Sequence, residues 1–73
     1  MAEIADNKIH HGHNLFLLRK QDGLKQETVA LAYGCKQNRI SQLENQETIS
    51  DDVLEWFANY YGVTLENILE IRK

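Results

Sequence analysis

The chain has 73 residues, 42% of them hydrophobic and 26% charged, and a formal net charge of −3. A chain this short has too little apolar surface for two cores, and its composition is ordinary for a globular domain, which excludes a multidomain protein, a disordered tail and a fibre. We expect no transmembrane helix, because no stretch is long and apolar enough to span a membrane. We expect no signal peptide, because the N-terminus lacks the basic and apolar regions of one. Cys35 is the single cysteine, so an internal disulfide cannot form and we expect a soluble protein of the reducing cytoplasm.

The first predicted helix extends from about Lys8 to Gln21. Leu15 and Leu18 stand at helical spacing, with His11 one turn earlier, and the pair Asp22-Gly23 ends the segment. Proline is absent and only 4 glycines occur, so the chain permits uninterrupted helices with glycines between them. This composition predicts an all-α domain.

Two short helices are predicted next, over Gln26–Tyr33 and Gln37–Asn45. Gly34 lies between them, where a left-handed residue ends a helix. Ile40 and Leu43 share one side of the second segment, while its other sides are polar and not acidic. Two short helices joined by a turn at a glycine are a helix-turn-helix candidate.

Two more helices complete the prediction. Ser50 followed by two aspartates is typical of a helix start, with the hydroxyl capping free amides, and this helix is expected to end at Tyr61 before Gly62. Its core stripe is Leu54, Phe57, Ala58 and Tyr61. Thr64 opens the last helix, expected from Leu65 to about Arg72, whose apolar face holds Leu65, Ile68 and Leu69.

Several separated groups of residues share the spacing of a known family. They are Gly12-x-Asn14-Leu15-x-x-Leu18-Arg19, Leu24-x-Gln26-Glu27-x-Val29-Ala30, Gly34, Ile40-Ser41-x-Leu43-Glu44-Asn45 and Leu54-x-x-Phe57-Ala58-x-x-Tyr61-Gly62-Val63. Over roughly residues 9 to 70 the chain resembles the Cro/C1-type (XRE) helix-turn-helix, as in lambdoid phage repressors and Cro. The resemblance implies a compact five-helix, lambda-repressor-like domain over residues 8–73 after a flexible segment at 1–7. Helices 2 and 3 would form the helix-turn-helix, with helix 3 in the major groove.

The resemblance implies base-reading roles for four residues of the third helix. Gln37, Asn38 and Gln42 are the implied base readers, and Arg39 lies on the same side, near a base or a phosphate. An amide side chain offers a donor and an acceptor that match the N6 and N7 edge of adenine, while an arginine matches O6 and N7 of guanine.

Five further residues are predicted to bind the DNA backbone. Gln26 resembles the family glutamine that holds a phosphate and braces the first residue of the reading helix, and Asn45 resembles one that contacts backbone after it. Lys25 and Lys36 stand where the family has capping Ser or Thr, and phosphate attraction would explain a cation at these helix starts. Arg19 belongs to the same basic region and completes the predicted phosphate ligands.

Charge is unevenly distributed along the chain. Residues 19–43 carry +3, whereas residues 1–18 carry −1 and residues 44–73 carry −5, with Glu44, Glu47, Asp51, Asp52, Glu55, Glu66 and Glu70 supplying the negative charges of the last part. Because DNA affinity comes from neutralising phosphates, the basic part is the expected DNA side and the acidic part is expected to point away.

The family commonly pairs through its last helix. The resemblance therefore makes Leu65, Leu69 and Ile71 candidate dimer contacts, with two reading helices about one DNA turn apart. Trp56 falls off the core stripe of its helix, and its aromatic surface fits either a dimer contact or packing under the N-terminal segment.

Other chemistry finds little support. His10, His11 and His13 point in different directions on a helix, and no Cys or carboxylate stands at ligand spacing beside them, so no metal is expected; His11 also stands where the family has an aliphatic residue. Cys35 is expected to be a buried, inert thiol under the turn. Asp51-Asp52 fits a solvated helix cap better than a catalytic pair, so we expect no enzyme and no cofactor. Because we expect no second domain, we also expect no small-molecule effector.

These observations predict a sequence-specific DNA-binding transcriptional regulator that acts as a homodimer, most simply a repressor of phage, mobile-element or bacterial type. The alternative is a protein-interaction module with the same fold, such as an antitoxin or co-regulator. It is favoured by the acidic C-terminal part and by Gln46, which replaces the glycine that the family has after Glu44-Asn45.

Overall fold

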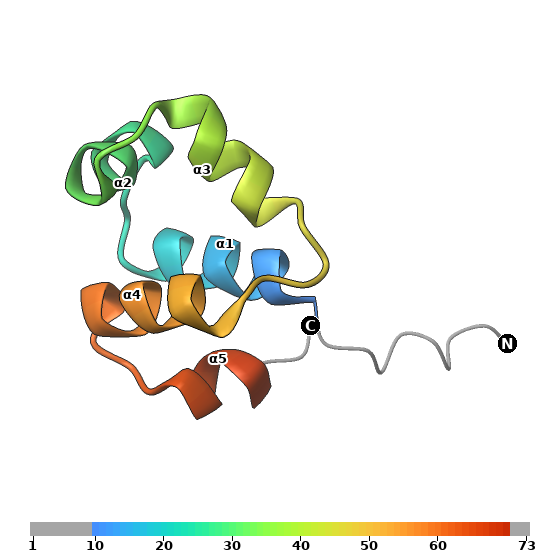
Figure 1. Ribbon diagram of the computed structural model, residues 1–73. Coiled ribbons are helices and arrows are strands. Elements are labelled where there is room, and N and C mark those ends of the chain that lie inside the picture. Colours follow the sequence, from blue (N-terminus) through green and yellow to red (C-terminus); the bar gives the residue numbers. More distant parts are fainter. Residues whose placement is uncertain (1–9, 71–73) are drawn as a thin grey trace, which may run out of the picture.

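A computed structural model describes residues 10–70, which form five helices joined by turns (Figure 1). They are α1 (His11–Gln21), α2 (Gln26–Tyr33), α3 (Gln37–Glu44), α4 (Asp51–Tyr61) and α5 (Leu65–Glu70). The all-α, five-helix prediction is confirmed. The predicted flexible segment at 1–7 and the end of the last predicted helix lie outside the described residues.

The helix α1 is central to the arrangement. It packs against α3 on one side and against α4 and α5 on the other, while α2 packs on α3 (Figure 1). The pair α2 and α3 therefore projects from a base made of α1, α4 and α5. Within residues 10–70, no helix is long and apolar enough to cross a bilayer.

The helix boundaries follow the predicted start and stop signals with two corrections. Gly34 and Gly62 adopt left-handed backbone, with φ of 90° and 72°, and end α2 and α4 as expected. The first helix begins at His11 and not at about Lys8, because His10 is extended and its Nδ1 accepts a hydrogen bond from the His13 amide at 2.9 Å. The third ends at Glu44, and Asn45 is its C-cap.

Side-chain capping is sparse at the helix starts. Lys25 and Lys36 occupy the N-cap positions of α2 and α3 and make no capping hydrogen bond, as the sequence predicts. Ser50 also makes none, so the predicted hydroxyl cap of α4 is wrong; the aspartates in its first turn still favour the positive end of the helix dipole. Thr64 does cap α5, since its Oγ1 accepts a hydrogen bond from the Asn67 amide at 3.0 Å.

One hydrophobic core runs through all five helices. Its buried members are Leu15, Leu18, Val29, Ala30, Ile40, Leu43, Ile49, Leu54, Phe57, Ala58 and Ile68. The predicted stripes of α1, α3 and α4 supply most of them, while Tyr61, Leu65 and Leu69 are half-buried around the edge.

Ile49 is a core residue that periodicity does not reveal, because it lies in the turn between α3 and α4. Its backbone amide donates a hydrogen bond of 2.9 Å to Nδ1 of His11. A histidine in this place thus satisfies a backbone donor that an aliphatic side chain would leave without a partner.

Tyr61 has a buried hydroxyl for which residues 10–70 offer no hydrogen-bond partner. Burial raises the pKa of this hydroxyl above its ordinary value, and the negative charge of Glu44 adds to the effect. We expect Tyr61→Phe to raise the free energy of unfolding by about 1 kcal/mol, since it removes an unsatisfied buried polar group. Urea denaturation measures this change.

Tyr33→Phe is the matched control for Tyr61→Phe, because Tyr33 is also half-buried and its ring stacks on Phe57 at 5.6 Å. Its hydroxyl is not among the buried atoms without a partner, so we expect no gain in stability. A loss of stability in Tyr61→Phe would show that the Tyr61 hydroxyl makes a hydrogen bond in solution.

Candidate nucleic-acid interface

The exposed side of α3 carries four of the predicted site residues. Ile40 and Leu43 are buried against the rest of the domain, which turns the opposite side of the helix outward. The side chains left exposed there are those of Gln37, Asn38, Arg39 and Gln42, the four predicted base readers. The structure therefore gathers donors, acceptors and one cation on a single accessible helix surface.

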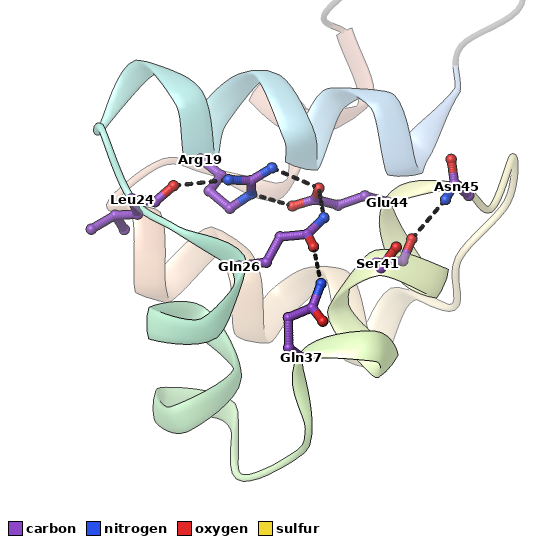
Figure 2. Close-up of polar contacts among 7 residues, drawn as sticks. All are labelled: Arg19, Leu24, Gln26, Gln37, Ser41, Glu44 and Asn45. Carbon is purple, nitrogen blue, oxygen red and sulfur yellow. Dashed lines mark hydrogen bonds and ion pairs between the residues drawn. The ribbon is translucent and has the colours of Figure 1, made fainter.

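The side chain of Gln37 is hydrogen-bonded to that of Gln26 at the start of α2 (Figure 2). The Gln37 amide nitrogen donates a hydrogen bond to the Gln26 oxygen, and the Gln26 nitrogen donates to Oε1 of Glu44 at 2.9 Å. An amide nitrogen has two hydrogens, so Gln37 keeps one hydrogen and its oxygen side by side for another partner. The side chain is thus oriented without losing the pair of groups that would match an adenine edge.

Glu44 is the anchor of this network and forms a buried ion pair with Arg19 (Figure 2). The Arg19 Nε and Nη2 donate to the two carboxylate oxygens at 2.6 and 3.0 Å, and Nη1 donates to the Leu24 carbonyl at 2.8 Å. Both residues are 8% exposed. The Glu44 carboxylate raises the pKa of the Arg19 guanidinium, so the pair stays charged.

Arg19 therefore has a different place from the one predicted. Its guanidinium is buried and donates hydrogen bonds to Glu44 and to the Leu24 carbonyl, so it positions the network and is not a free cation for a phosphate. Glu44, which the sequence assigns to the exposed acidic part of the chain, is buried as well. Sequence reasoning missed this residue as part of the site, although it stands directly before Asn45 in the motif that carries the family resemblance.

The other predicted phosphate ligands lie around the ends of α2 and α3. Lys25 and Lys36 are exposed at the two uncapped helix starts, where free backbone amides and the helix dipole favour an anion. Asn45 is exposed at the end of α3, and its Nδ2 donates to the Ser41 carbonyl at 3.0 Å. Lys25, Gln26 and Gln37 share one open hollow between the two helices.

Comparison with known proteins agrees with this geometry. A family model described as helix-turn-helix matches residues 15–68, from α1 into α5. The chain belongs to the Cro/C1-type helix-turn-helix family. Its five-helix arrangement is the lambda-repressor-like fold of that family, and the protein is a DNA-binding helix-turn-helix regulator. No curated protein and no solved structure matches the chain.

In this helix-turn-helix domain the exposed cations and most of the exposed acidic residues lie on different helices, with Asp22 and Glu27 as acidic residues among the cations. The exposed cations Lys20, Lys25, Lys36 and Arg39 come from the end of α1 and from the helix-turn-helix. The exposed acidic residues of the later part are Glu47, Asp51, Asp52, Glu55, Glu66 and Glu70, mostly on α4 and α5. With Glu44 paired to Arg19, the exposed surface of α3 itself carries no carboxylate.

The histidines and the cysteine have local roles in the helix-turn-helix domain. His10 and His11 each accept a backbone amide hydrogen bond through Nδ1. Across residues 10–70, no three side chains of His, Cys, Asp or Glu lie close enough together to hold a metal ion. Cys35 is half-buried against the core, less covered than the sequence predicts, because it follows Gly34 in the exposed turn.

The predicted dimer contacts of the helix-turn-helix domain are partly accessible. Leu65 and Leu69 are half-buried on α5, and Ile71 lies outside the described residues. Trp56 is also half-buried, but it packs within its own chain: its ring stands edge-on to Tyr33 at 4.7 Å and stacks on Tyr60 at 5.0 Å. Neither predicted partner, the N-terminal segment or a second subunit, is needed to explain this position.

Proposed function

We propose that this protein is a sequence-specific transcriptional repressor of the cytoplasm, formed by residues 8–73, that binds double-stranded DNA as a homodimer and reads the major groove with α3. The observation that carries the proposal is the hydrogen-bond network that runs from the buried pair of Arg19 and Glu44 through the half-buried Gln26 to the exposed Gln37. It fixes the direction of a base-reading amide before DNA is present, and preorganised groups lose less entropy on binding.

Base recognition would use the exposed side of α3. Gln37, Asn38 and Gln42 each offer an amide that can form two hydrogen bonds with adenine, and Arg39 can form two with guanine. Each good pair of this kind discriminates against a wrong base by about 1–3 kcal/mol. Four such side chains on one helix are enough to define a short half-site.

Phosphate contacts would position the domain on the duplex. Lys25 and Lys36 supply charge beside the free amides of two helix starts, and Gln26 and Asn45 supply amide donors. These contacts carry no sequence information. The two lysine contacts depend on salt, because each phosphate that a lysine neutralises releases counterions.

Dimerisation would join two such half-sites. Leu65 and Leu69 on α5 give a partly exposed apolar edge, with Ile71 beyond the described residues. Pairing through this edge would place two α3 helices about 34 Å apart, one turn of DNA, and would select an operator with inverted symmetry.

The direct test is selection from random DNA duplexes at moderate salt, followed by measurement of affinity for the enriched sequence. We expect Gln37→Ala and Asn38→Ala each to lower affinity for the selected duplex by about 1–3 kcal/mol and to leave binding to random duplexes almost unchanged. Fluorescence anisotropy with labelled duplexes measures both quantities.

Lys36→Ala is the matched control, because it changes an exposed residue directly before the reading helix. It should weaken binding to both duplexes and reduce the slope of log affinity against log salt by about 0.9. Equal losses on both duplexes for Gln37→Ala and Asn38→Ala would contradict base reading. Failure to enrich any sequence with the folded protein would contradict the proposed function.

A second candidate, a protein-interaction module such as an antitoxin or co-regulator, is favoured by the exposed acidic residues of α4 and α5. Asp51, Asp52 and Glu55 present carboxylates on one end of α4, where a basic partner would find complementary charge. Recovery of one protein in fixed proportion, with no dependence on DNA, would support this function over the first.

A further inference from the structure

A second hollow lies beside the network described above. It is lined by His13 and Phe16 of α1, by Gln26 of α2, and by Glu44 and Asn45 at the end of α3. Gln26 lines both this hollow and the one that contains Lys25 and Gln37. Gln26 and Asn45, two of the four residues proposed to contact the DNA backbone, therefore share a surface depression with His13, to which the family resemblance gives no role.

The ring of His13 is held in place but has free nitrogens. It stacks on Phe16 with centroids 5.7 Å apart and stands edge-on to His10 at 6.3 Å, and it is half-buried. The capping bond of α1 uses only the His13 backbone amide. Among residues 10–70, the imidazole nitrogens have no hydrogen-bond partner, so both are open to a ligand.

Among residues 10–70, the fixed charges in the lining of this hollow and directly beside it cancel. Glu44 is the carboxylate in its lining, and it is paired with Arg19, whose guanidinium also lies 5.5 Å from the Phe16 ring centroid. His10 is the other titratable group in contact with the His13 ring. A proton on His13 would therefore give the hollow a net positive charge and a second N–H donor.

The neutral groups in the hollow also suit an anion. Gln26 donates one amide hydrogen to Glu44 and Asn45 donates one to the Ser41 carbonyl, which leaves each nitrogen with a second hydrogen. Two amide hydrogens and an imidazolium are donors that a phosphate oxygen accepts.

We propose that His13 is a further phosphate-binding residue of the DNA interface, acting on the phosphate held by Gln26 and Asn45. This inference rests on the proposed function. Protonation adds a positive charge and an N–H donor to the ring, and the protonated form binds the anion, so DNA affinity rises as the pH falls.

The test compares wild-type protein, His13→Gln and His13→Lys on the selected duplex at about pH 6 and about pH 8. Wild type should bind about fivefold more tightly at the lower pH, as expected when a neutral hydrogen bond becomes a charged one. Its salt slope should be steeper there by about 0.9. His13→Gln should show neither change, and His13→Lys should bind tightly with the steep slope at both pH values.

His10→Asn is the matched control, because asparagine keeps an N-cap acceptor for α1 while removing the neighbouring titratable ring. It should retain the pH response of the wild type. Thermal unfolding at both pH values identifies any effect that comes from stability, including one from His11. If His13→Gln keeps the pH response of the wild type, this inference is wrong, but the proposed function is unaffected. If the wild type shows no specific binding at either pH, both the inference and the proposed function are wrong.

Discussion

Glu44→Gln is expected to lower the free energy of unfolding by about 3–5 kcal/mol, the usual loss when one partner of a buried ion pair is removed. The change keeps the shape of the side chain, so the loss reports the charge. The Arg19 guanidinium, in a residue only 8% exposed, would remain a buried cation without a carboxylate partner. Chemical denaturation measures the change in stability.

A second effect follows, because Glu44 joins three parts of the chain. Its carboxylate holds Arg19 of α1 and Gln26 of α2 from its own position at the end of α3, and Arg19 also holds the Leu24 carbonyl. An amide at this position has one oxygen where the carboxylate has two, so Gln26 and Arg19 compete for it. We therefore expect weaker specific DNA binding even where the variant remains folded.

Two controls separate these effects. Glu55→Gln removes an exposed carboxylate from α4 and should change stability by less than about 0.5 kcal/mol. The double variant Arg19→Met with Glu44→Leu replaces the whole pair by apolar groups and should recover much of the stability. It should not recover specific DNA binding, because Gln26 still lacks its acceptor. A Glu44→Gln loss as small as that of Glu55→Gln would contradict the structural role of the pair.

The helices of this domain could be predicted from the sequence because their signals are local. The glycines at 34 and 62 take the left-handed backbone that ends α2 and α4, and apolar spacing identifies the buried sides of α1, α3 and α4. The exposed set on α3 follows from the same spacing, since the residues opposite Ile40 and Leu43 must face outward.

The polar contacts between helices could not be predicted in this way. Arg19 and Glu44 are 25 positions apart, and the Asn14 side chain donates to the Ile68 carbonyl across 54 positions. Periodicity shows which side of a helix is buried but not which residue it meets there. The sequence therefore places Arg19 and Glu44 on two separate charged surfaces. In the structure they are buried together, because neither charge could be buried without the other as its partner.

Gly12 lies where α1 closely approaches the end of α3. A Cβ atom built there would lie 2.6 Å from the carbonyl carbon of Glu44, well inside the normal contact distance. The same approach lets the first amides of α1 bond to the chain after α3: His11 donates to the Glu47 carbonyl and Gly12 to the Gln46 carbonyl, both at 2.9 Å. Glycine at this position thus allows α1 to pack directly against the end of α3.

Gly12→Ala is therefore expected to lower the free energy of unfolding by more than about 3 kcal/mol, above the usual cost of overpacking, because the clash is with backbone that cannot rotate away. Relief of the clash would separate α1 from the end of α3, break the two amide bonds and shift Glu44 relative to Arg19. Denaturant titration gives the stability, and binding to the selected duplex reports the displacement of α3.

Gly23→Ala is the control that isolates the clash. Gly23 has φ of 71° and open space around its Cβ position, so alanine there adds only the strain of a left-handed backbone, about 1–2 kcal/mol. Gly12 has the opposite combination, an ordinary helical backbone and no space. If the Gly12→Ala protein proved no less stable than the Gly23→Ala protein, the close approach of α1 and α3 could not be what fixes the reading helix on the domain.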